Sequence, residues 1–443
     1  MQKAKDESEK ISEELALFGG NPVRKKPLPP EFPGVPFYDE REMELVGRVI
    51  KARNPFRFYG PDLQHMCDRL EEAFARERGV KYALGVSSGT EALYVSLAAM
   101  GVGPGDEVLL QGYLWTSCIN AIVRLGAIPR MVDIDDTFTM SPDDLEKKIG
   151  PHSKVVLFVH MSGAAGNIEP VVEIARKHDL LVLEDCAQAN GAKLNGRYIG
   201  TFGDIGIHSL QINKNITSGE GGVILCSDEH LYKRCFAAHD LGYARDDKGK
   251  LMQTSPDERY QLWGAGARMS EITGALALAQ FEKIGGIVSS MQSSKWKIRN
   301  RLEGIPGLHF RRVLDPDGDT GCFLIFTLDT PELCEQFVKA LNAEGIRGEG
   351  ASHPCMTMED WNLHWFFNNI SLVHKRSISP GGWPWTLAEN AFARDYSYDR
   401  KTLPNCDDLA ARSGILMIAS DMRSDDIEDI VLAFRKVAKH LLS

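Results

Sequence analysis

Leu180-Leu181-Val182-Leu183-Glu184-Asp185-Cys186-Ala187-Gln188-Ala189 is an apolar run that ends in two carboxylates and an amide. Short apolar runs bounded by polar residues are typical of buried strands. Similar runs lie at 82–86, 107–110, 155–160 and 223–226, and helical patterns separate them along the chain. Because continuous apolar strands that alternate with helices favour a covered parallel sheet, the sequence predicts an α/β fold with a mostly parallel sheet.

Asp185 and Gln188 follow this predicted strand at its carboxyl end, where ligands bind in open α/β sheets. A carboxylate at this place can hold a pyridine nitrogen protonated, because a close opposite charge shifts a pKa by roughly 1 to 3 units. An amide three residues further on can donate to a phenolic oxygen of the same ring. A turn or helix-cap aspartate and a surface amide are the simpler interpretations of the two residues.

The next informative stretch is Ser209-Leu210-Gln211-Ile212-Asn213-Lys214-Asn215-Ile216-Thr217-Ser218-Gly219-Glu220-Gly221-Gly222. Lys214 offers the amine that an aldehyde cofactor needs for a Schiff base. Ser209 offers a hydroxyl for a phosphate, although it could be an ordinary hydroxyl at a strand end. A single lysine is usually solvated, but together with Asp185 it predicts a site for pyridoxal 5'-phosphate (PLP).

Two further segments supply groups that such a cofactor needs. Ser88, Gly89 and Thr90 open a predicted helix after the 82–86 strand, where free N–H groups and the helix dipole favour a phosphate. Ser and Thr at this place could equally cap only their own helix. Trp115 follows another strand and could stack on an aromatic ring, or it could be a core tryptophan.

Composition limits the possible functions. The chain has 443 residues, 43% of them hydrophobic and 25% charged, and a net charge of −10, which predicts an ordinary globular enzyme that does not bind nucleic acid. No run of 18 apolar residues is present, and 1–10 is too polar for a signal-peptide core. We therefore expect a cytoplasmic protein without a membrane partner. Nine scattered cysteines without a Cys-x-x-Cys pair predict reduced thiols and no metal site.

The distribution of Gly, Pro and charged residues along the chain predicts three parts. Residues 1–36 read as an N-terminal arm, since they combine charges with Gly and Pro turns. Residues 37–285 form the large domain with the predicted sheet. Residues 286–443 form a smaller α+β domain, in which 351–405 is rich in Trp, Pro, Asn and His and is interpreted as a long loop on the substrate side.

The sequence resembles the PLP-dependent sugar aminotransferases of the DegT/DnrJ/StrS family, closely over about 40–285 and loosely beyond. The motifs that carry this resemblance occur in the family's order: Ser-Gly-Thr-x-Ala at 88–92, Gly-Asp-Glu-Val at 105–108, Trp115, Val-Asp-Ile-Asp at 132–135, His160-x-x-Gly163, Glu-Asp-x-Ala-Gln-Ala at 184–189, and Ser-x(4)-Lys at 209–214 with Gly-Glu-Gly-Gly at 219–222.

The resemblance implies the fold of aspartate aminotransferase, the PLP fold type I. It implies Lys214 as the Schiff-base lysine, Asp185 on the pyridine nitrogen and Gln188 near the phenolic oxygen. It also places Trp115 against the ring, and Gly89, Thr90 and Ser209 around the phosphate.

The activity that this resemblance implies belongs to amino sugar biosynthesis. Glutamate or glutamine would give its amino group to the cofactor, and the pyridoxamine phosphate formed would pass it to a ketone of a sugar or cyclitol. Residues 15–24 resemble the branch that aminates keto-cyclitols, and family members are typically homodimers with active sites at the interface.

Three alternatives remain beside this interpretation. A sugar dehydratase of the same fold replaces the Schiff-base lysine by histidine, which Lys214 argues against. A non-catalytic ligand-binding or regulatory relative lacks support from any basic DNA-binding segment. A nicotinamide enzyme is disfavoured because no Gly-x-Gly-x-x-Gly follows a predicted strand.

The chain departs from the family pattern at two places. The family's Gly-x-Asn-x-Arg-Met segment, whose Asn reaches the neighbouring subunit's phosphate, reads Gly-Ala-Gly-Ala-Arg-Met at 264–269. Gly266 therefore has no side chain for that contact. The 351–405 segment is also longer than the usual loop on the acceptor side, so the resemblance does not identify the substrate.

Overall fold

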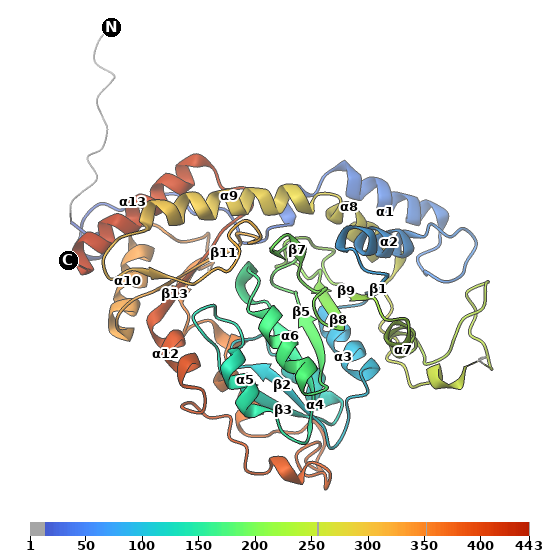
Figure 1. The fold of residues 1–443 in the computed structure, drawn as a ribbon. Helices are drawn as coiled ribbons and strands as arrows, with labels where there is room; N and C mark the ends of the chain where they lie inside the picture. The colour runs from blue at the N-terminus through green and yellow to red at the C-terminus, as the bar shows by residue number, and fades with distance from the viewer. Residues whose placement is uncertain (1–13, 255–256, 351, 443) are drawn as a thin grey trace.

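A seven-stranded sheet forms the centre of the computed structural model, which describes residues 14–254, 257–350 and 352–442 (Figure 1). Four neighbouring pairs in it are parallel, and β9 pairs antiparallel with both β1 and β8. In spatial order the strands are β1 (Tyr82–Val86), β9 (Gly222–Cys226), β8 (Ile205–Ser209), β5 (Leu181–Asp185), β4 (Ser153–Val159), β2 (Glu107–Gln111) and β3 (Ile128–Val132). The mostly parallel α/β sheet is confirmed.

Both faces of this sheet are buried, which explains why its strands are apolar without alternation. In β4, Leu157 packs with α3 (Gly89–Ala99) and α4 (Ser117–Arg124) on one face. Phe158, its neighbour, packs with α5 (Pro142–Lys148) and α6 (Ile168–Lys177) on the other. Nearer the β1 edge, α1 (Glu40–Ala52), α2 (Met66–Arg78) and α8 (Glu271–Phe281) form a further layer, and α7 (Glu229–His239) contacts α3.

A second, antiparallel sheet has four strands. Their order is β10 (His309–Phe310), β11 (Phe323–Thr327), β13 (Ser413–Met417) and β12 (Cys355–Thr357). The helices α9 (Ile284–Leu302), α10 (Pro331–Ala343) and α13 (Ser424–Leu441) pack against it or against one another. A two-stranded hairpin, β6 (Lys193–Leu194) and β7 (Arg197–Tyr198), lies apart from both sheets.

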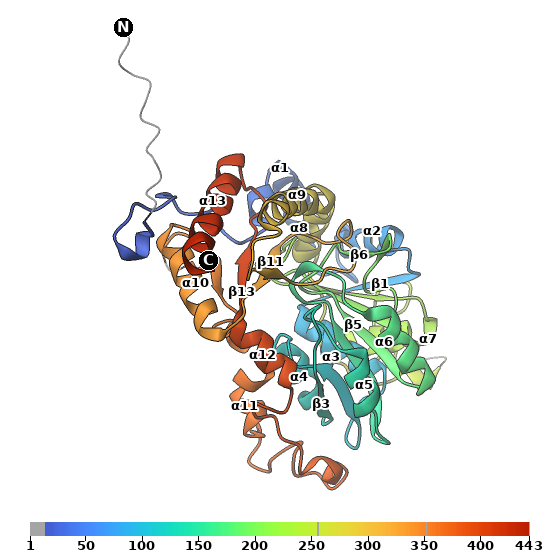
Figure 2. The ribbon, with the colours of Figure 1, turned by 60° about the vertical axis from the view of Figure 1, so that its left-hand side comes forward.

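The segment predicted as a long loop packs onto the large sheet. After β12 it forms the short helices η5 (Asn362–His364), η6 (Phe366–Asn368), α11 (Ile370–Val373) and η7 (Ala391–Ala393), and it leads into α12 (Pro404–Arg412). Trp365 is fully buried and stacks on Tyr113 with ring centroids 4.6 Å apart. Figure 2 shows this segment in orange below α12 and beside α4. Several of its aromatic residues therefore belong to the core of the first sheet: Trp361, Trp365, Phe366, Phe367 and Tyr398. The predicted division of the chain into domains stays a prediction.

The described part of the N-terminal arm, residues 14–36, is attached to the second sheet's helices. It includes η1 (Ala16–Phe18) and runs into η2 (Val35–Phe37). Arg24 forms ion pairs with Asp426 at 2.6 Å and with Asp429 at 2.8 Å, both on α13. Since Arg24 and Asp426 are both buried, this cluster fixes the start of the chain against the second sheet.

Two expectations from composition can be compared with the structure. All nine cysteines are free and buried, which confirms the prediction of unpaired thiols. Within the described ranges, no helix combines the length and the apolar character that a membrane crossing requires.

Candidate active site

A cavity of about 600 Å³ opens where β4, β5 and β8 end. Parallel strands bring their carboxyl ends to one edge of the sheet, which is where ligands bind in open α/β folds. All eight residues predicted for the site line this cavity: Ser88, Gly89, Thr90, Trp115, Asp185, Gln188, Ser209 and Lys214. The structure thus brings these residues together, whereas their individual roles stay predictions.

The start of α3 forms one wall of the cavity. Ser88 is its N-cap, and the Ser88 hydroxyl accepts from the N–H of Glu91 at 3.1 Å. The N–H groups of Gly89 and Thr90 have no acceptor in the part of the chain that the structure describes. Unpaired donors at a helix N-terminus attract an anion. The local structure therefore fits a phosphate, and Ser88 serves its own helix at the same time.

Gly89 packs closely against Ser209 at the end of β8. A Cβ at this position would lie 2.8 Å from the Cβ of Ser209, so no larger residue fits between α3 and the end of β8. The Thr90 hydroxyl, by contrast, lies 2.8 Å from the hydroxyl of Ser117. Backbone N–H groups and three hydroxyls thus meet at one end of the cavity.

Asp185 is buried at the end of β5, with 3% of its surface exposed. One carboxylate oxygen accepts from the N–H of Ala187 at 2.8 Å, and the other accepts from the thiol of Cys118 at 3.2 Å. Burial raises the pKa of Asp185, and the nearby positive charge of Lys214 lowers it. A cationic ring nitrogen would stabilise the ionised form further, so the donor set fits a pyridinium partner.

Lys214 places its amine in the same cavity. Its backbone is held in a turn by a hydrogen bond from its N–H to the carbonyl of Gln211 at 3.0 Å. Burial lowers the pKa of Lys214, while the charge of Asp185 opposes that shift. A lysine with a lowered pKa is neutral for a larger part of the time, as a nucleophilic amine must be.

Gln188 connects the cavity to the 351–405 segment. Its side-chain oxygen accepts from the N–H of Ser162 at 3.2 Å, and its nitrogen lies 3.1 Å from Nε2 of His364. The indole N–H of Trp361 donates to the same His364 nitrogen at 2.9 Å. Burial lowers the pKa of His364 to about 3, so the neutral ring accepts at Nε2 and donates from Nδ1.

Trp115 stands at the mouth of the cavity with 40% of its surface exposed. Its ring packs against the ring of His364 in a tilted arrangement, with centroids 4.8 Å apart and an interplanar angle of 46°. The exposed indole is available for stacking on a flat ligand. Trp115 is therefore a cavity residue and not a core tryptophan.

Sequence reasoning missed several residues of the cavity. His364 and Glu31 carry no motif, because each reaches the cavity only through tertiary packing. Cys118, also without a motif, does not line the cavity but contacts Asp185 from α4. His364 was visible only as one of several histidines in an aromatic segment without metal-ligand spacing. Glu31 lies in the arm, far from every motif.

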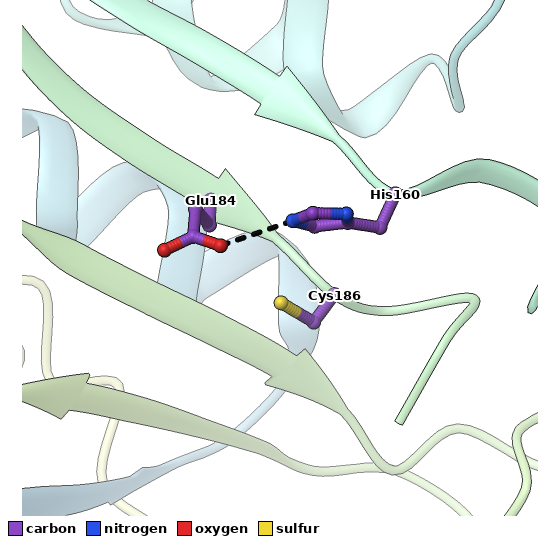
Figure 3. A group of neighbouring side chains, drawn as sticks. All are labelled: His160, Glu184 and Cys186. Atoms are coloured by element: carbon purple, nitrogen blue, oxygen red, sulfur yellow. Dashed lines mark hydrogen bonds and ion pairs between the residues drawn. The ribbon is translucent and has the colours of Figure 1, made fainter. Parts of the chain in front are cut away.

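His160, Glu184 and Cys186 form a buried cluster at the ends of β4 and β5 (Figure 3). Their possible ligand atoms lie within 4.8 Å of one another. Nε2 of His160 donates to Glu184 at 3.0 Å, and Nδ1 accepts from the N–H of Gly166. Glu184 also accepts from two backbone N–H groups, of Gly200 and Gly203. Burial raises the pKa of Cys186 well above its usual range, so it stays a thiol. Because His160 and Glu184 are hydrogen-bonded to each other and to backbone N–H groups, we interpret the cluster as structural.

Gly266 adopts the left-handed conformation, with φ of +66°. Asn and Gly tolerate that conformation best, which gives a physical reason why Gly can stand where the family has Asn. Its N–H donates to the carbonyl of Asp240 at 2.8 Å, and a Cβ there would meet open space. Apart from its chain neighbours, no atom of residues 14–254, 257–350 or 352–442 lies within 4 Å of that Cβ, so nothing described takes the place of the missing amide.

Comparisons with known proteins agree with this geometry. Residues 39–363 match the model of the DegT/DnrJ/EryC1/StrS aminotransferase family. A putative L-glutamine:3-amino-2,3-dideoxy-scyllo-inosose aminotransferase of Streptoalloteichus tenebrarius is 33% identical over 371 residues, which cover 80% of this chain and 86% of that protein. An L-glutamine:2-deoxy-scyllo-inosose aminotransferase of Streptomyces kanamyceticus is 36% identical over 277 residues, covering 62% of this chain and 64% of that one.

Solved structures show the same fold. The crystal structure of 3-amino-5-hydroxybenzoic acid synthase superimposes with a TM-score of 0.75 at 23% identity, and the alignment covers 94% of this chain and 99% of that one. The α/β fold is thus that of the fold type I PLP enzymes, as predicted. Because the family model matches most of the chain, the protein belongs to the DegT/DnrJ/EryC1/StrS family and is an aminotransferase.

Proposed function

We propose that this aminotransferase binds PLP through Lys214 and moves an amino group from glutamate or glutamine to a ketone of a sugar or cyclitol. The observation that carries the proposal is that a partly buried amine, a buried carboxylate and a free helix N-terminus line one cavity. These are the three groups that hold the aldehyde, the pyridine nitrogen and the phosphate of PLP.

Each end of the cavity has its own part in binding. The N–H groups of Gly89 and Thr90, with the hydroxyls of Thr90 and Ser209, would hold the phosphate. Asp185 would hold the ring nitrogen, and Gln188 and Trp115 would contact the ring's phenolic oxygen and its face. When bound, PLP supplies the electron sink for a carbanion at the substrate carbon.

Lys214 is the proposed proton carrier in both half-reactions. Its Nζ would take the proton from the donor's α-carbon and deliver it within the cavity, then act in reverse on the acceptor. Burial lowers the pKa of this amine, so that a larger fraction of it is neutral than for a solvated lysine. Cys118 would help to keep Asp185 ionised by its hydrogen bond.

The substrate classes rest on the relatives. Two of the similar proteins are named for L-glutamine as donor and for a keto-cyclitol as acceptor, and others are named GDP-perosamine synthases. A dehydratase of the same fold is not favoured, because Lys214 is present where that variant carries histidine. The nine unpaired thiols support a cytoplasmic enzyme.

A homodimer with interface active sites is part of the proposal. Trp263, just before the 264–269 segment, has 97% of its surface exposed in this protomer. Exposed aromatic residues of that size are typical of protein interfaces. Among the described residues, nothing beyond its chain neighbours lies within 4 Å of a Cβ at Gly266, and we propose that a second copy packs against this open place.

Replacing Lys214 tests the proposed function. Lys214→Ala should lower transamination between L-glutamine and a keto-cyclitol by more than about 1000-fold, since it removes both the covalent link and the base. Lys339→Ala, an exposed lysine on α10, is the matched control and should keep full activity. Full activity of Lys214→Ala would overturn the assignment.

A further inference from the structure

The N-terminal arm crosses the mouth of the active-site cavity, and Glu31, Phe32 and Pro33 form part of its lining. The arm is fixed on both sides of the mouth. The hydroxyl of Ser420, beyond β13, donates to the carbonyl of Pro33 at 2.7 Å. The hydroxyl of Tyr38 donates to the carbonyl of Thr217 at 2.9 Å, three residues after Lys214.

The carboxylate of Glu31 has a fixed orientation at this mouth. Both of its oxygens lie within hydrogen-bonding distance of the Ser352 hydroxyl, at 2.8 and 3.0 Å. Ser352 is itself held by backbone bonds to Glu349 and Gly348. One hydroxyl hydrogen satisfies only one of the lone pairs of a carboxylate, so Glu31 keeps strong acceptor capacity for a ligand.

The charges around the cavity favour a cation. Glu31, Asp185 and Glu220 line it, whereas Lys214 is the only lysine or arginine among the lining residues of the described chain. In the proposed function, Asp185 holds the ring nitrogen of the cofactor, and Lys214 carries protons beside the reacting carbon. The carboxylates of Glu31 and Glu220 then remain for the substrate, and on the part of the wall that this chain supplies they attract a positively charged group.

We propose that Glu31 recognises an ammonium group that the keto acceptor already carries, so that the acceptor class is an amino-keto-cyclitol or amino-keto sugar. The inference rests on the proposed function and deepens it. A hydrogen bond between an ammonium and a carboxylate is about twice as strong as a neutral one. Glu31 therefore discriminates between an amine and a hydroxyl on the same ring carbon.

The acceptor pair that tests this recognition is 3-amino-2,3-dideoxy-scyllo-inosose and 2-deoxy-scyllo-inosose, which differ in an amine or a hydroxyl on one ring carbon. The cofactor of the purified protein is first converted to pyridoxamine phosphate with L-glutamine. The rate at which each acceptor converts it back to PLP is then followed by absorbance. The wild type should prefer the amine-bearing acceptor. In Glu31→Gln, kcat/KM for that acceptor should fall by about 30-fold, within the range of one charged hydrogen bond, and by less than about threefold for the other.

Two matched variants separate the contact from general effects. Glu349→Gln makes the same charge change on an exposed residue beside Ser352, and it should leave both acceptors unaffected. Ser352→Ala keeps the charge of Glu31 but removes the hydrogen bond that fixes its carboxylate. It should lower kcat/KM only for the amine-bearing acceptor. Calorimetric Kd values of both cyclitols should show the same selective loss when PLP has first been fixed to Lys214 by borohydride reduction, because this form can neither aminate them nor condense with their amine.

The outcomes distinguish this inference from the proposed function. An equal loss for both acceptors in Glu31→Gln, no loss for either, or a slower half-reaction with L-glutamine would overturn the recognition of an ammonium group. In each of those cases the aminotransferase assignment survives. A wild-type protein that takes no amino group from L-glutamine or glutamate would overturn both.

Discussion

The thiol of Cys118 lies 3.2 Å from a carboxylate oxygen of Asp185, and both groups are buried. This contact joins the first turn of α4 to the end of β5, where Asp185 lines the cavity. The thiol hydrogen bond lowers the pKa of Asp185 and opposes the larger effect of burial. The carboxylate proposed for the pyridine nitrogen is thus supported by a residue that no motif indicates.

Asp185→Asn should keep the fold and lose most activity. Removing an opposite charge from a ring nitrogen changes its pKa by roughly 1 to 3 units, so we expect a loss in kcat of about 10- to 1000-fold. Steady-state kinetics measure the change, and circular dichroism checks the fold. An active Asp185→Asn enzyme would show that another group holds the ring nitrogen.

Cys118→Ala should move the acidic limb of the kcat/KM profile to higher pH. The substitution removes the thiol hydrogen bond that lowers the pKa of Asp185, so a higher pH is needed to ionise the carboxylate. Cys118→Ser keeps a donor and should restore the wild-type profile. Identical profiles for all three proteins would mean that the contact has no effect on ionisation.

Gly89→Ala should weaken PLP binding by at least about tenfold. A Cβ at this position would lie 2.8 Å from the Cβ of Ser209, and displacing α3 moves the N–H groups proposed for the phosphate. Gly103→Ala is the control, because a Cβ there meets nothing within 4 Å. The Kd for PLP is measured by absorbance titration, and equal affinity of the two variants would contradict the phosphate assignment.

His364 should make the folded protein less stable in acid. Burial lowers its pKa from 6.5 to about 3, so between these values the unfolded chain binds a proton that the folded one does not. Stability then falls by about 1.4 kcal/mol per pH unit as the pH drops from 6 to 4. His364→Gln should reduce the slope of the free energy of unfolding by that amount, measured in urea. An unchanged slope would mean that His364 is protonated in the folded state.

Arg24→Ala should destabilise the protein by about 3 to 5 kcal/mol, because it leaves Asp426 buried without its cation. The same change should release the arm that places Glu31 at the cavity, which raises KM for the acceptor. Adding Asp426→Asn removes the unpaired charge and should restore part of the stability. The free energy of unfolding and KM of the three proteins test both effects.

The apolar strands could be predicted because a strand that is buried on both faces appears in the sequence as an uninterrupted run of apolar residues. The runs at 82–86, 107–110 and 223–226 match β1, β2 and β9 within one residue at each end. β3 was missed because Pro129 and Arg130 interrupt its apolar pattern, and β8 because Gly206 and His208 do so. Two of the pairings are antiparallel, and periodicity does not specify strand direction.

The motif residues of the site could also be predicted, since their chemistry is local in the sequence. Glu31 and His364 could not, because they reach the cavity only when distant segments pack together, and the contact of Cys118 with Asp185 likewise depends on tertiary packing. The aromatic 351–405 segment was interpreted as a loop because its residues have no helical or strand period. In the structure, Trp365 and its neighbours are buried by the large sheet, a contact that only the tertiary fold provides.

Reduction with sodium borohydride, followed by peptide mass spectrometry, tests the central claim most directly. Purified protein saturated with PLP is reduced, digested and mapped. We predict a stable phosphopyridoxyl group on the peptide that contains Lys214, and none after the protein has first been converted with L-glutamine. A label on another lysine, or no label in spite of added PLP, would contradict the assignment of Lys214 and of the cavity around it.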